Sequence, residues 1–255
     1  MKIPLRLLCL SLFFVAAAFT LRAAPDTRVF ELRTYTAAPG KLADVLTRFR
    51  DHTCKLFEKH GMMNIGYWVP IQESEGSHEK LVYLLVHKSR EAATASWAEF
   101  RADPEWQSVQ KASEANGKIV LKTESIFLSP TDFSPTLFPQ SGRTIRLFEL
   151  RTYTAAEGKL GALETRYREH VLELYARHGI TALGFWHPLD ADKGAGHTLI
   201  TLLCYPDGAA SAAAWGGFSA DPDWAKAKAE SEKNGKLTTD TKVVALAPTD
   251  FSPTQ

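Results

Sequence analysis

The sequence predicts an α+β fold in which two ferredoxin-like repeats, each β-α-β-β-α-β, close into one pseudo-symmetric α+β barrel. Residues 30–42 return with one change as residues 148–160, and the same shift of 118 positions continues without a gap to the end of the chain. A repeat of this length has the size of a small domain. An antiparallel sheet with helices on one face leaves its other face to be covered, and a second copy can cover it.

The elements of each repeat follow from periodicity and turn residues. Residues 29–36 alternate apolar and polar side chains as a strand does, and a helix from residue 42 ends at Gly61, which can adopt the left-handed conformation of a helix C-terminus. Two further helices follow a hairpin, and the second begins at Asp103-Pro104-Glu105, where an N-cap, a proline and an acid succeed one another. The remaining predicted strands cover residues 65–69, 81–86 and 119–128.

Repeats, turns and composition divide the chain into four parts. We assign residues 1–24 to an export signal, residues 28–136 to the first repeat, residues 137–145 to a linker and residues 146–254 to the second repeat. The linker contains proline and glycine, which are typical of connections between domains.

The N-terminus has the features of a cleaved export signal. Lys2 and Arg6 precede an apolar run over residues 7–19, and small residues follow. The run is shorter than the ~20 residues that span a bilayer, and cleavage after Ala18 fits the small-x-small rule. We therefore expect a secreted or periplasmic protein with no membrane association after the signal is removed. A retained membrane anchor is the alternative.

Composition bears on the classes of partner and cofactor. The 255 residues include 30 basic and 29 acidic side chains, a net charge of +1, with no basic run. Because phosphate binding needs clustered Lys and Arg, we expect no nucleic-acid partner. Cys54 and Cys204 correspond to Leu172 and Val86 of the other repeat, so each is interpreted as a small core residue. The sequence holds no metal-binding motif, and we expect no metal and no cofactor.

Several motifs together resemble one known family. They are the Glu-Leu-Arg-x-Tyr strand, the glycine turn after it, His52, Gly66-x-Trp68, Asp103-Pro104-x-Trp106 and the terminal Phe-Ser-Pro. With this combination of motifs the chain resembles two NIPSNAP-family domains in tandem, and the resemblance covers nearly all residues after the predicted export signal. The resemblance implies the dimeric α+β barrel superfamily, which also houses cofactor-free monooxygenases, isomerases and some haem enzymes. An exported protein departs from the mitochondrial and vesicle-traffic roles tied to the family, so the resemblance implies a fold without a settled chemistry.

Two polar strand rows supply the first candidates for ligand binding, namely Arg33 and Tyr35 with their repeat-two mates Arg151 and Tyr153. Because the apolar row of the strand should face the helices, we expect the polar row to face the barrel interior, where buried charge needs partners. Arg and Tyr would hold a carboxylate or carbonyl group, with the neighbouring Glu orienting the Arg. The alternative is a structural Glu–Arg pair at the seam between repeats.

Histidines and tryptophans supply the other candidates. His52 and His170 fall in the predicted apolar stripe of the first helix of each repeat, where a neutral imidazole would be a general base, a haem ligand or a core side chain bonded to a backbone carbonyl. Trp68 and Trp186 lie on strands. Gly66 precedes Trp68 by two positions on the same face, which would leave space for a ligand, and core packing is the alternative.

These candidates support three interpretations of function. The first is a protein that binds a small organic molecule inside the barrel, and it is the one we expect. The second is a cofactor-free monooxygenase-like enzyme, in which deprotonation of the substrate near His52 or Tyr35 would precede reaction with oxygen. The third is a non-enzymatic structural or interaction protein, whose Phe-Ser-Pro tails would clasp a neighbouring repeat or subunit. Closure of the barrel within one chain and closure by exchange in a homo-oligomer both stay open.

Overall fold

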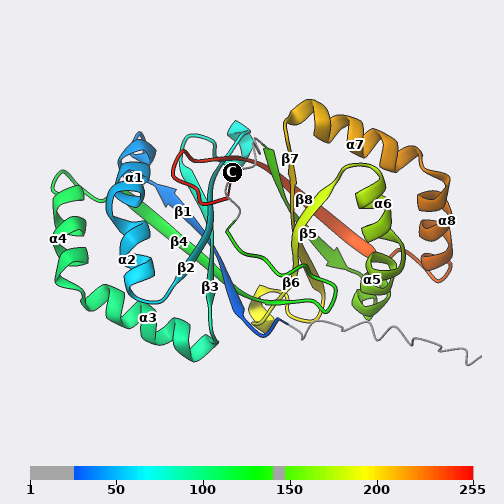
Figure 1. Ribbon diagram of the computed structural model, residues 1–255, viewed down its shortest axis with the longest axis horizontal. Coiled ribbons are helices and arrows are strands. Elements are labelled where there is room, and N and C mark those ends of the chain that lie inside the picture. The colour runs from blue at the N-terminus through cyan, green and yellow to red at the C-terminus, as the bar shows by residue number, and fades with distance from the viewer. Residues whose placement is uncertain (1–25, 140–146, 255) are drawn as a thin grey trace, which may run out of the picture.

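The protein forms an α+β barrel, as the sequence predicts. The computed structural model describes residues 26–139 and 147–254. Its eight described strands close into a barrel in the order β1-β3-β2-β8-β5-β7-β6-β4, with the helices of the first repeat on one side and those of the second repeat on the opposite side (Figure 1). The predicted export signal lies outside the described residues, as does the linker from residue 140 onwards.

The two repeats contain the same elements in the same order. The first consists of β1 (Val29–Ala37), α1 (Leu42–Arg48), a π-helical turn (Phe49–Thr53), α2 (Cys54–Lys59), β2 (Met63–Pro70), β3 (Lys80–His87), α3 (Arg90–Ala102), α4 (Pro104–Ser113) and β4 (Val120–Pro130). The second consists of β5 (Leu147–Ala155), α5 (Leu160–Arg166), a π-helical turn (Tyr167–Val171), α6 (Leu172–Arg177), β6 (Thr181–Pro188), β7 (Thr198–Tyr205), α7 (Gly208–Ala220), α8 (Pro222–Ser231) and β8 (Thr238–Pro248).

The barrel closes within one chain through two equivalent seams. Strand β8 pairs with β2, where Trp68 lies opposite Pro248. Strand β4 pairs with β6, where Pro130 lies opposite Trp186. The residues of one seam are therefore the repeat mates of the residues of the other, and a pseudo-twofold axis relates the two halves.

The segment after the last strand of each repeat crosses to the other repeat. The Thr249 N–H donates to the Tyr67 carbonyl at 2.9 Å, and the Tyr67 N–H donates to Ser252 Oγ at 3.0 Å. In the other direction the Phe185 N–H donates to Ser134 Oγ at 2.9 Å. Each terminal Phe-Ser-Pro segment thus clasps the opposite repeat, the arrangement that the sequence predicts for the tails.

The helix that begins at Pro104 has the predicted N-terminus. The Asp103 side chain caps it by accepting the Glu105 N–H at 2.8 Å. His60 Nε2 lies 2.7 Å from the same carboxylate, so the cap also ties the end of α2 to the start of α4.

The barrel interior is packed with apolar side chains from all eight strands. They include Phe30, Trp68, Phe148 and Trp186, each at most 1% exposed. An eight-stranded barrel is just wide enough for its own side chains to fill it. A residual space of about 10 Å³ remains among them, which has room for about one water molecule at most.

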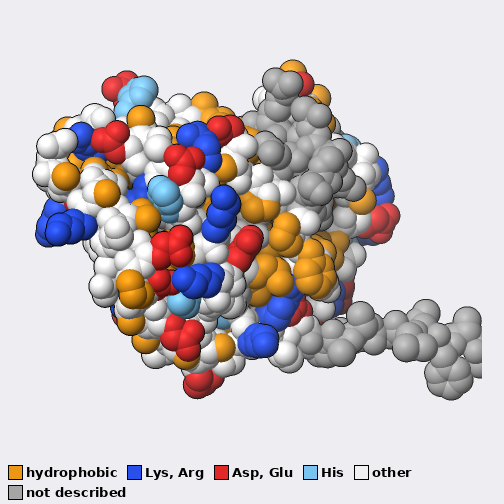
Figure 2. Space-filling view, turned by 60° about the vertical axis from the view of Figure 1, so that its left-hand side comes forward, with side chains coloured by type: hydrophobic (Ala, Val, Ile, Leu, Met, Phe, Trp, Pro, Cys, Tyr) orange, Lys and Arg blue, Asp and Glu red, His pale blue; other side chains and the backbone are white. Residues whose placement is uncertain are grey.

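The outer surface mixes both signs of charge. Acidic and basic side chains are interspersed over the face that Figure 2 presents. Among the helices of the described residues, none is long and apolar enough to cross a membrane.

Candidate functional site

The polar row of the first strand faces the helices, and the orientation predicted from the sequence is wrong. The Phe30 side chain fills the barrel, whereas Arg33 lies 4.2 Å from the centre of the Trp97 ring on α3. Arg151 lies 3.7 Å from the Trp215 ring on α7 in the same way. The physical reason is that the closed barrel excludes water more fully than the layer under the helices does. The apolar row therefore occupies the barrel, and the charged row finds polar partners on the helices.

A buried glutamate anchors each arginine. Glu31 accepts hydrogen bonds from Trp97 Nε1 at 2.7 Å, Ser125 Oγ at 2.6 Å and Arg33 Nη1 at 2.5 Å, and His87 Nε2 lies 3.0 Å from it. Burial alone would raise the pKa of Glu31, but the His87 hydrogen bond and the Arg33 charge outweigh it, with help from Ser125 and Trp97, and lower the pKa to about 2. Glu31 is therefore a fixed carboxylate at neutral pH.

The second repeat keeps this anchor with a different hydroxyl. Glu149 accepts hydrogen bonds from Arg151 Nε at 2.8 Å, Trp215 Nε1 at 3.1 Å and Ser211 Oγ at 2.7 Å. Ser211 lies on α7, whereas the serine of the first repeat, Ser125, lies on β4. A serine hydroxyl thus donates to the buried carboxylate in both repeats, although a different element carries the serine in each. We infer that the buried carboxylate needs a hydroxyl donor, whichever element supplies it.

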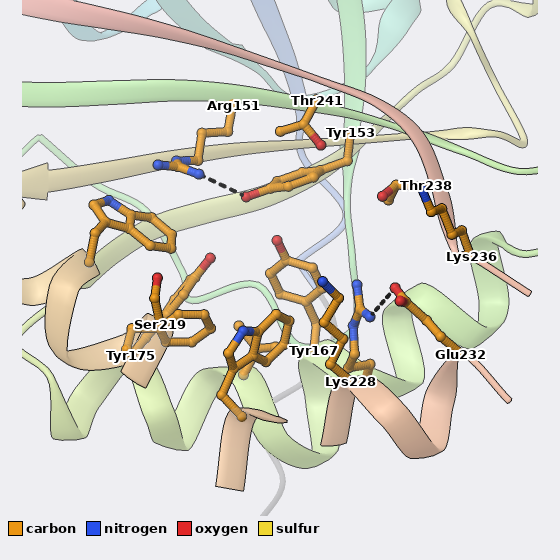
Figure 3. A pocket seen from close by; sticks show the side chains of 15 residues that line it. Arg151, Tyr153, Tyr167, Tyr175, Ser219, Lys228, Glu232, Lys236, Thr238 and Thr241 are labelled. Carbon is orange, nitrogen blue, oxygen red and sulfur yellow. Dashed lines mark hydrogen bonds and ion pairs between the residues drawn. The ribbon is translucent and has the colours of Figure 1, made fainter. Parts of the chain in front are cut away.

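A cavity of about 410 Å³ lies beside the second of these anchors, between the sheet and the helices of repeat two (Figure 3). Arg151 and Tyr153 of β5 form its wall on the sheet side, together with Thr241 of β8. Side chains of the helices close it from the other side: Arg166, Tyr167, Val171, Tyr175, Trp215, Phe218, Ser219, Trp224, Lys228 and Glu232. Its volume is that of a site for a small organic molecule.

The cavity is positively charged. Arg166 is paired with Glu232 at 2.9 Å, and Arg151 is paired with the buried Glu149. Two further lining cations, Lys228 and Lys236, form no ion pair with another described residue. Glu232 is the one carboxylate that lines the cavity within the described ranges 26–139 and 147–254. The lining thus carries more positive than negative charge, and the surplus lies on the two lysines.

Three tyrosine hydroxyls converge on the cavity, as Figure 3 shows. The Tyr153 hydroxyl lies 3.5 Å from Arg151 Nη1. Burial raises the pKa of Tyr167 and of Tyr175 well above the usual value, so both phenols stay protonated at neutral pH. The cavity therefore offers neutral O–H donors beside cationic groups, a combination suited to anionic oxygen.

Comparison with known proteins places the chain in a family. The NIPSNAP family model matches residues 30–135 and, a second time, residues 148–253. The chain belongs to the NIPSNAP family. Its two matched segments make it a tandem NIPSNAP protein, as the resemblance of its motifs implies.

Relatives support the family and the fold. The chain is 28% identical over 144 residues to a NipSnap homologue of Dictyostelium discoideum, and the alignment spans 56% of each protein, so the chain covers little more than half of that curated relative. A solved monooxygenase candidate from Lactobacillus acidophilus has a TM-score of 0.57 at 12% identity, over 88% of this chain and 94% of its own. A second monooxygenase candidate, from Fusobacterium nucleatum, has a TM-score of 0.58 at 8% identity, over 87% and 92%. At these identities the two structures show the fold alone.

The two candidate tryptophans lie inside the barrel, away from the cavity, whereas Trp215 and Trp224 line the cavity. Trp68 and Trp186 are each 1% exposed and belong to the apolar core. A Cβ at Gly66 would collide with the Trp68 indole, and one at Gly184 would collide with Trp186. The predicted space above Gly66 is therefore filled by the tryptophan itself, and no room is left there for a ligand.

The two candidate histidines are exposed, and their predicted place in the apolar stripe is wrong. A π-helical turn adds one residue to the helix, so Thr53 and Val171 point inward where regular spacing would place His52 and His170. His52 lines an open groove between α1 and α4. His170 lines the groove between α6 and α8. Neither histidine is among the residues that line the cavity of the second NIPSNAP repeat.

Sequence reasoning missed most of the cavity-lining residues. Of its candidates, Arg151 and Tyr153 line the cavity, and Arg33 and Tyr35 occupy the equivalent positions of the first repeat. Differences between the two NIPSNAP repeats mark the others, because Tyr167, Tyr175 and Lys228 stand where the first repeat has an apolar or uncharged residue, namely Phe49, Phe57 and Gln110. Among the described residues, no group of three or more His, Cys, Asp or Glu side chains is arranged to hold a metal ion.

Proposed function

We propose that the protein binds a small organic anion in the cavity between the sheet and the helices of repeat two. The observation that carries this proposal is the charge of the lining. Lys228 and Lys236 have no anionic partner among the described residues, and Arg151 and the tyrosine hydroxyls lie beside them. A carboxylate or enolate ligand would receive charge-assisted hydrogen bonds from these groups. The site lies under the helices, which corrects the expected position inside the barrel.

Binding of matched acids and amides tests this proposal. Benzoate, hexanoate and succinate are titrated into the protein by calorimetry, each beside its uncharged amide. We expect at least one acid to bind more tightly than its amide. Lys228→Gln, which introduces the residue found at this position in the first repeat, should weaken the binding of that acid about 2- to 5-fold. This is the effect expected from losing one exposed charge contact. Lys111→Gln, which removes an exposed lysine of α4, is the control. Equal binding of acid and amide, or no binding of any acid, would overturn the proposal.

A monooxygenase-like activity is a second candidate, supported by the fold of the two solved neighbours and by the Arg151–Tyr153 pair, which would stabilise an anionic substrate oxygen. The imidazole base expected from the sequence does not line the described cavity, which makes binding the first choice. Oxygen uptake by the protein with a bound acid tests the activity. An uptake rate no higher than that of buffer would dismiss it.

We also propose that residues 1–24 export the protein. The support is sequence-based: Lys2 and Arg6 before an apolar run, then small residues that fit cleavage after Ala18. Mass spectrometry of the protein from fractionated bacterial cells tests it. We expect the mature chain to begin at Phe19 and to occur in the periplasm or the medium, and an intact Met1 in the cytoplasmic fraction would contradict the proposal.

A further inference from the structure

The helix α7 carries two consecutive glycines in its interior. Gly216 and Gly217 directly precede Phe218, which lines the repeat-two cavity. Because glycine has more backbone freedom than any other residue, each glycine inside a helix favours opening of that helix about 5-fold relative to alanine. The corresponding residues of α3 are Ala98 and Glu99, which are both good helix formers. The glycine pair is therefore specific to the second repeat.

Packing requires only one of these glycines. A Cβ on Gly217 would lie 2.7 Å from Nδ1 of His178, so the imidazole would have to move. Gly216 is exposed, and a Cβ there would enter open space. Its φ is not positive, so alanine fits the same backbone conformation. Neither packing nor backbone geometry requires glycine at position 216, which leaves its flexibility as the property it contributes.

The glycine pair separates two differently anchored parts of the helical layer. Before it, Trp215 Nε1 donates to the buried Glu149 at 3.1 Å, which fixes this part of α7 to the sheet. After it, the Phe218 ring packs against Tyr175 of α6 and Trp224 of α8, at ring-centre distances of 5.5 and 4.7 Å. The chain after the pair is therefore coupled to the helices, and to α8 by the shorter of the two contacts.

Helix α8 has few apolar attachments of its own. Of its ten described residues, Ala227 alone is buried. Polar contacts hold both of its ends: Glu232 pairs with Arg166 of α5 at 2.9 Å, and Asp221 lies 2.7 Å from His178 Nε2. Figure 1 shows α8 at the outer edge of the second repeat. An element with few buried apolar contacts opens at a low cost in free energy.

We propose that α8 and its flanking residues, 219–236, form a lid over the repeat-two cavity, with the glycine pair as its hinge. The lid carries Lys228 and Lys236, whereas Arg151 lies on the sheet wall of the cavity (Figure 3). An anion held between the two walls would bind the closed form more tightly than the open form and would therefore favour closure. The role of the lid in ligand entry rests on the proposed anion-binding function, whereas the hinge itself does not.

Hydrogen exchange in the ligand-free protein tests the hinge. In a helix, the amides of residues 218–220 bond to the carbonyls of residues 214–216, so opening at the glycine pair exposes them. Protection factors, which correct for intrinsic exchange rates, are measured by NMR. We expect the protection factors of residues 218–220 to be about 10-fold lower than those of their repeat mates, residues 100–102. Equal or higher protection in α7 would overturn the inference.

Substitution of Gly216 tests its part in the opening. Gly216→Ala should raise the protection factors of residues 218–220 about 5-fold. Gly161→Ala makes the same change in α5, where a Cβ also enters open space, and should leave those protection factors within about 2-fold. Ala98→Gly, at the exposed mate position of α3, should lower the protection of residues 100–102 about 5-fold. Unchanged protection in Gly216→Ala, or an equal rise in Gly161→Ala, would overturn the inference.

Ligand kinetics test the lid. Whichever of benzoate, hexanoate and succinate binds most tightly is mixed with the protein in a stopped-flow instrument. Tryptophan fluorescence reports binding, because Trp215 and Trp224 line the cavity. If the ligand enters and leaves through the open lid, Gly216→Ala should slow association and dissociation about 3- to 5-fold each and leave the dissociation constant within about 2-fold.

Unchanged rate constants in a Gly216→Ala variant with raised protection would show that α8 does not gate the cavity and would overturn the inference, while the anion-binding proposal would stand. If none of the three acids binds, the anion-binding proposal fails, and the exchange comparison between α7 and α3 still decides the hinge.

Discussion

The indole of Trp68 lies against the α-carbon of Gly66, two residues earlier on the same strand, and Trp186 lies against Gly184 in the same way. A glycine in a strand often marks such a close approach. Both pairs belong to the barrel core, where Trp68 packs on Phe148 and Trp186 packs on Phe30, at ring-centre distances of 5.3 and 5.4 Å. Each glycine therefore lets a tryptophan fold back over its own strand and fill the barrel.

Gly66→Ala is expected to destabilise the protein by about 1–3 kcal/mol, because the new methyl group would overlap the fully buried indole. Gly161→Ala, in α5 with open space around its α-carbon, should instead stabilise by about 0.5–1 kcal/mol through helix propensity. Urea unfolding of both variants measures the two effects. A Gly66→Ala variant as stable as the wild type would show that the indole has room to move.

Glu31 should make stability depend on pH in the acid range. Its folded pKa of about 2 lies below the unfolded value near 4.5, so its contribution is fully present above pH 4.5 and is lost as the pH falls toward 2. A shift of this size corresponds to roughly 3 kcal/mol. We expect Glu31→Gln to be less stable than the wild type at pH 7, with a difference that shrinks between pH 4.5 and 2.

Urea unfolding at pH 7, 4.5 and 3 measures this dependence, and Glu79→Gln, at an exposed position, is the control. A destabilisation by Glu31→Gln that stays constant over the three pH values would contradict the assignment of a depressed pKa to this carboxylate.

The C-terminal clasp should contribute measurably to stability. Ser252 is 2% exposed and accepts the buried Tyr67 N–H, so Ser252→Ala leaves that donor without its partner and should cost about 1–3 kcal/mol. Ser134→Ala, the repeat mate, should cost less because Ser134 is only half-buried. Thermal unfolding compares the two variants. The reverse order of stabilities would show that burial of the hydroxyl does not decide the effect.

Ligand binding should not depend on the helix histidines. His170 lies in the groove between α6 and α8 rather than in the cavity, so His170→Ala should leave the affinity for the best-bound acid within about 2-fold. Calorimetry with the acid chosen from the panel above measures this. A loss of 10-fold or more would place the binding site in the groove and argue against the cavity.

The fold was largely predictable from the sequence because the duplication and the strand periodicity are both explicit. The direction of the polar row was not. Strand alternation places Phe30 and Arg33 on opposite faces of the sheet. Both faces are covered in this fold, and periodicity alone does not tell which face excludes water more fully. The partners of Glu31 that decide it, Trp97 and Ser125, come from elements more than 60 residues away.

The helix phase and the cavity could not be predicted for different reasons. A single π-helical turn rotates the following residues, so His52 and Thr53 exchange the places that regular spacing assigns to them. Three of the side chains that line the cavity, Tyr167, Tyr175 and Lys228, differ between the repeats, so the identities of the two repeats do not mark it. Comparing the repeats for their differences, instead of their identities, would have pointed to Tyr167 and Lys228.

The reciprocal seams have an evolutionary consequence. Because β8 on β2 and β4 on β6 are the same contact made twice, two separate copies of one repeat would form the same barrel as an isologous homodimer. In such a homodimer every substitution appears in both halves. Joining the halves in one polypeptide removes that constraint, so the two halves can come to differ, as Tyr83 and Thr201 do at equivalent positions.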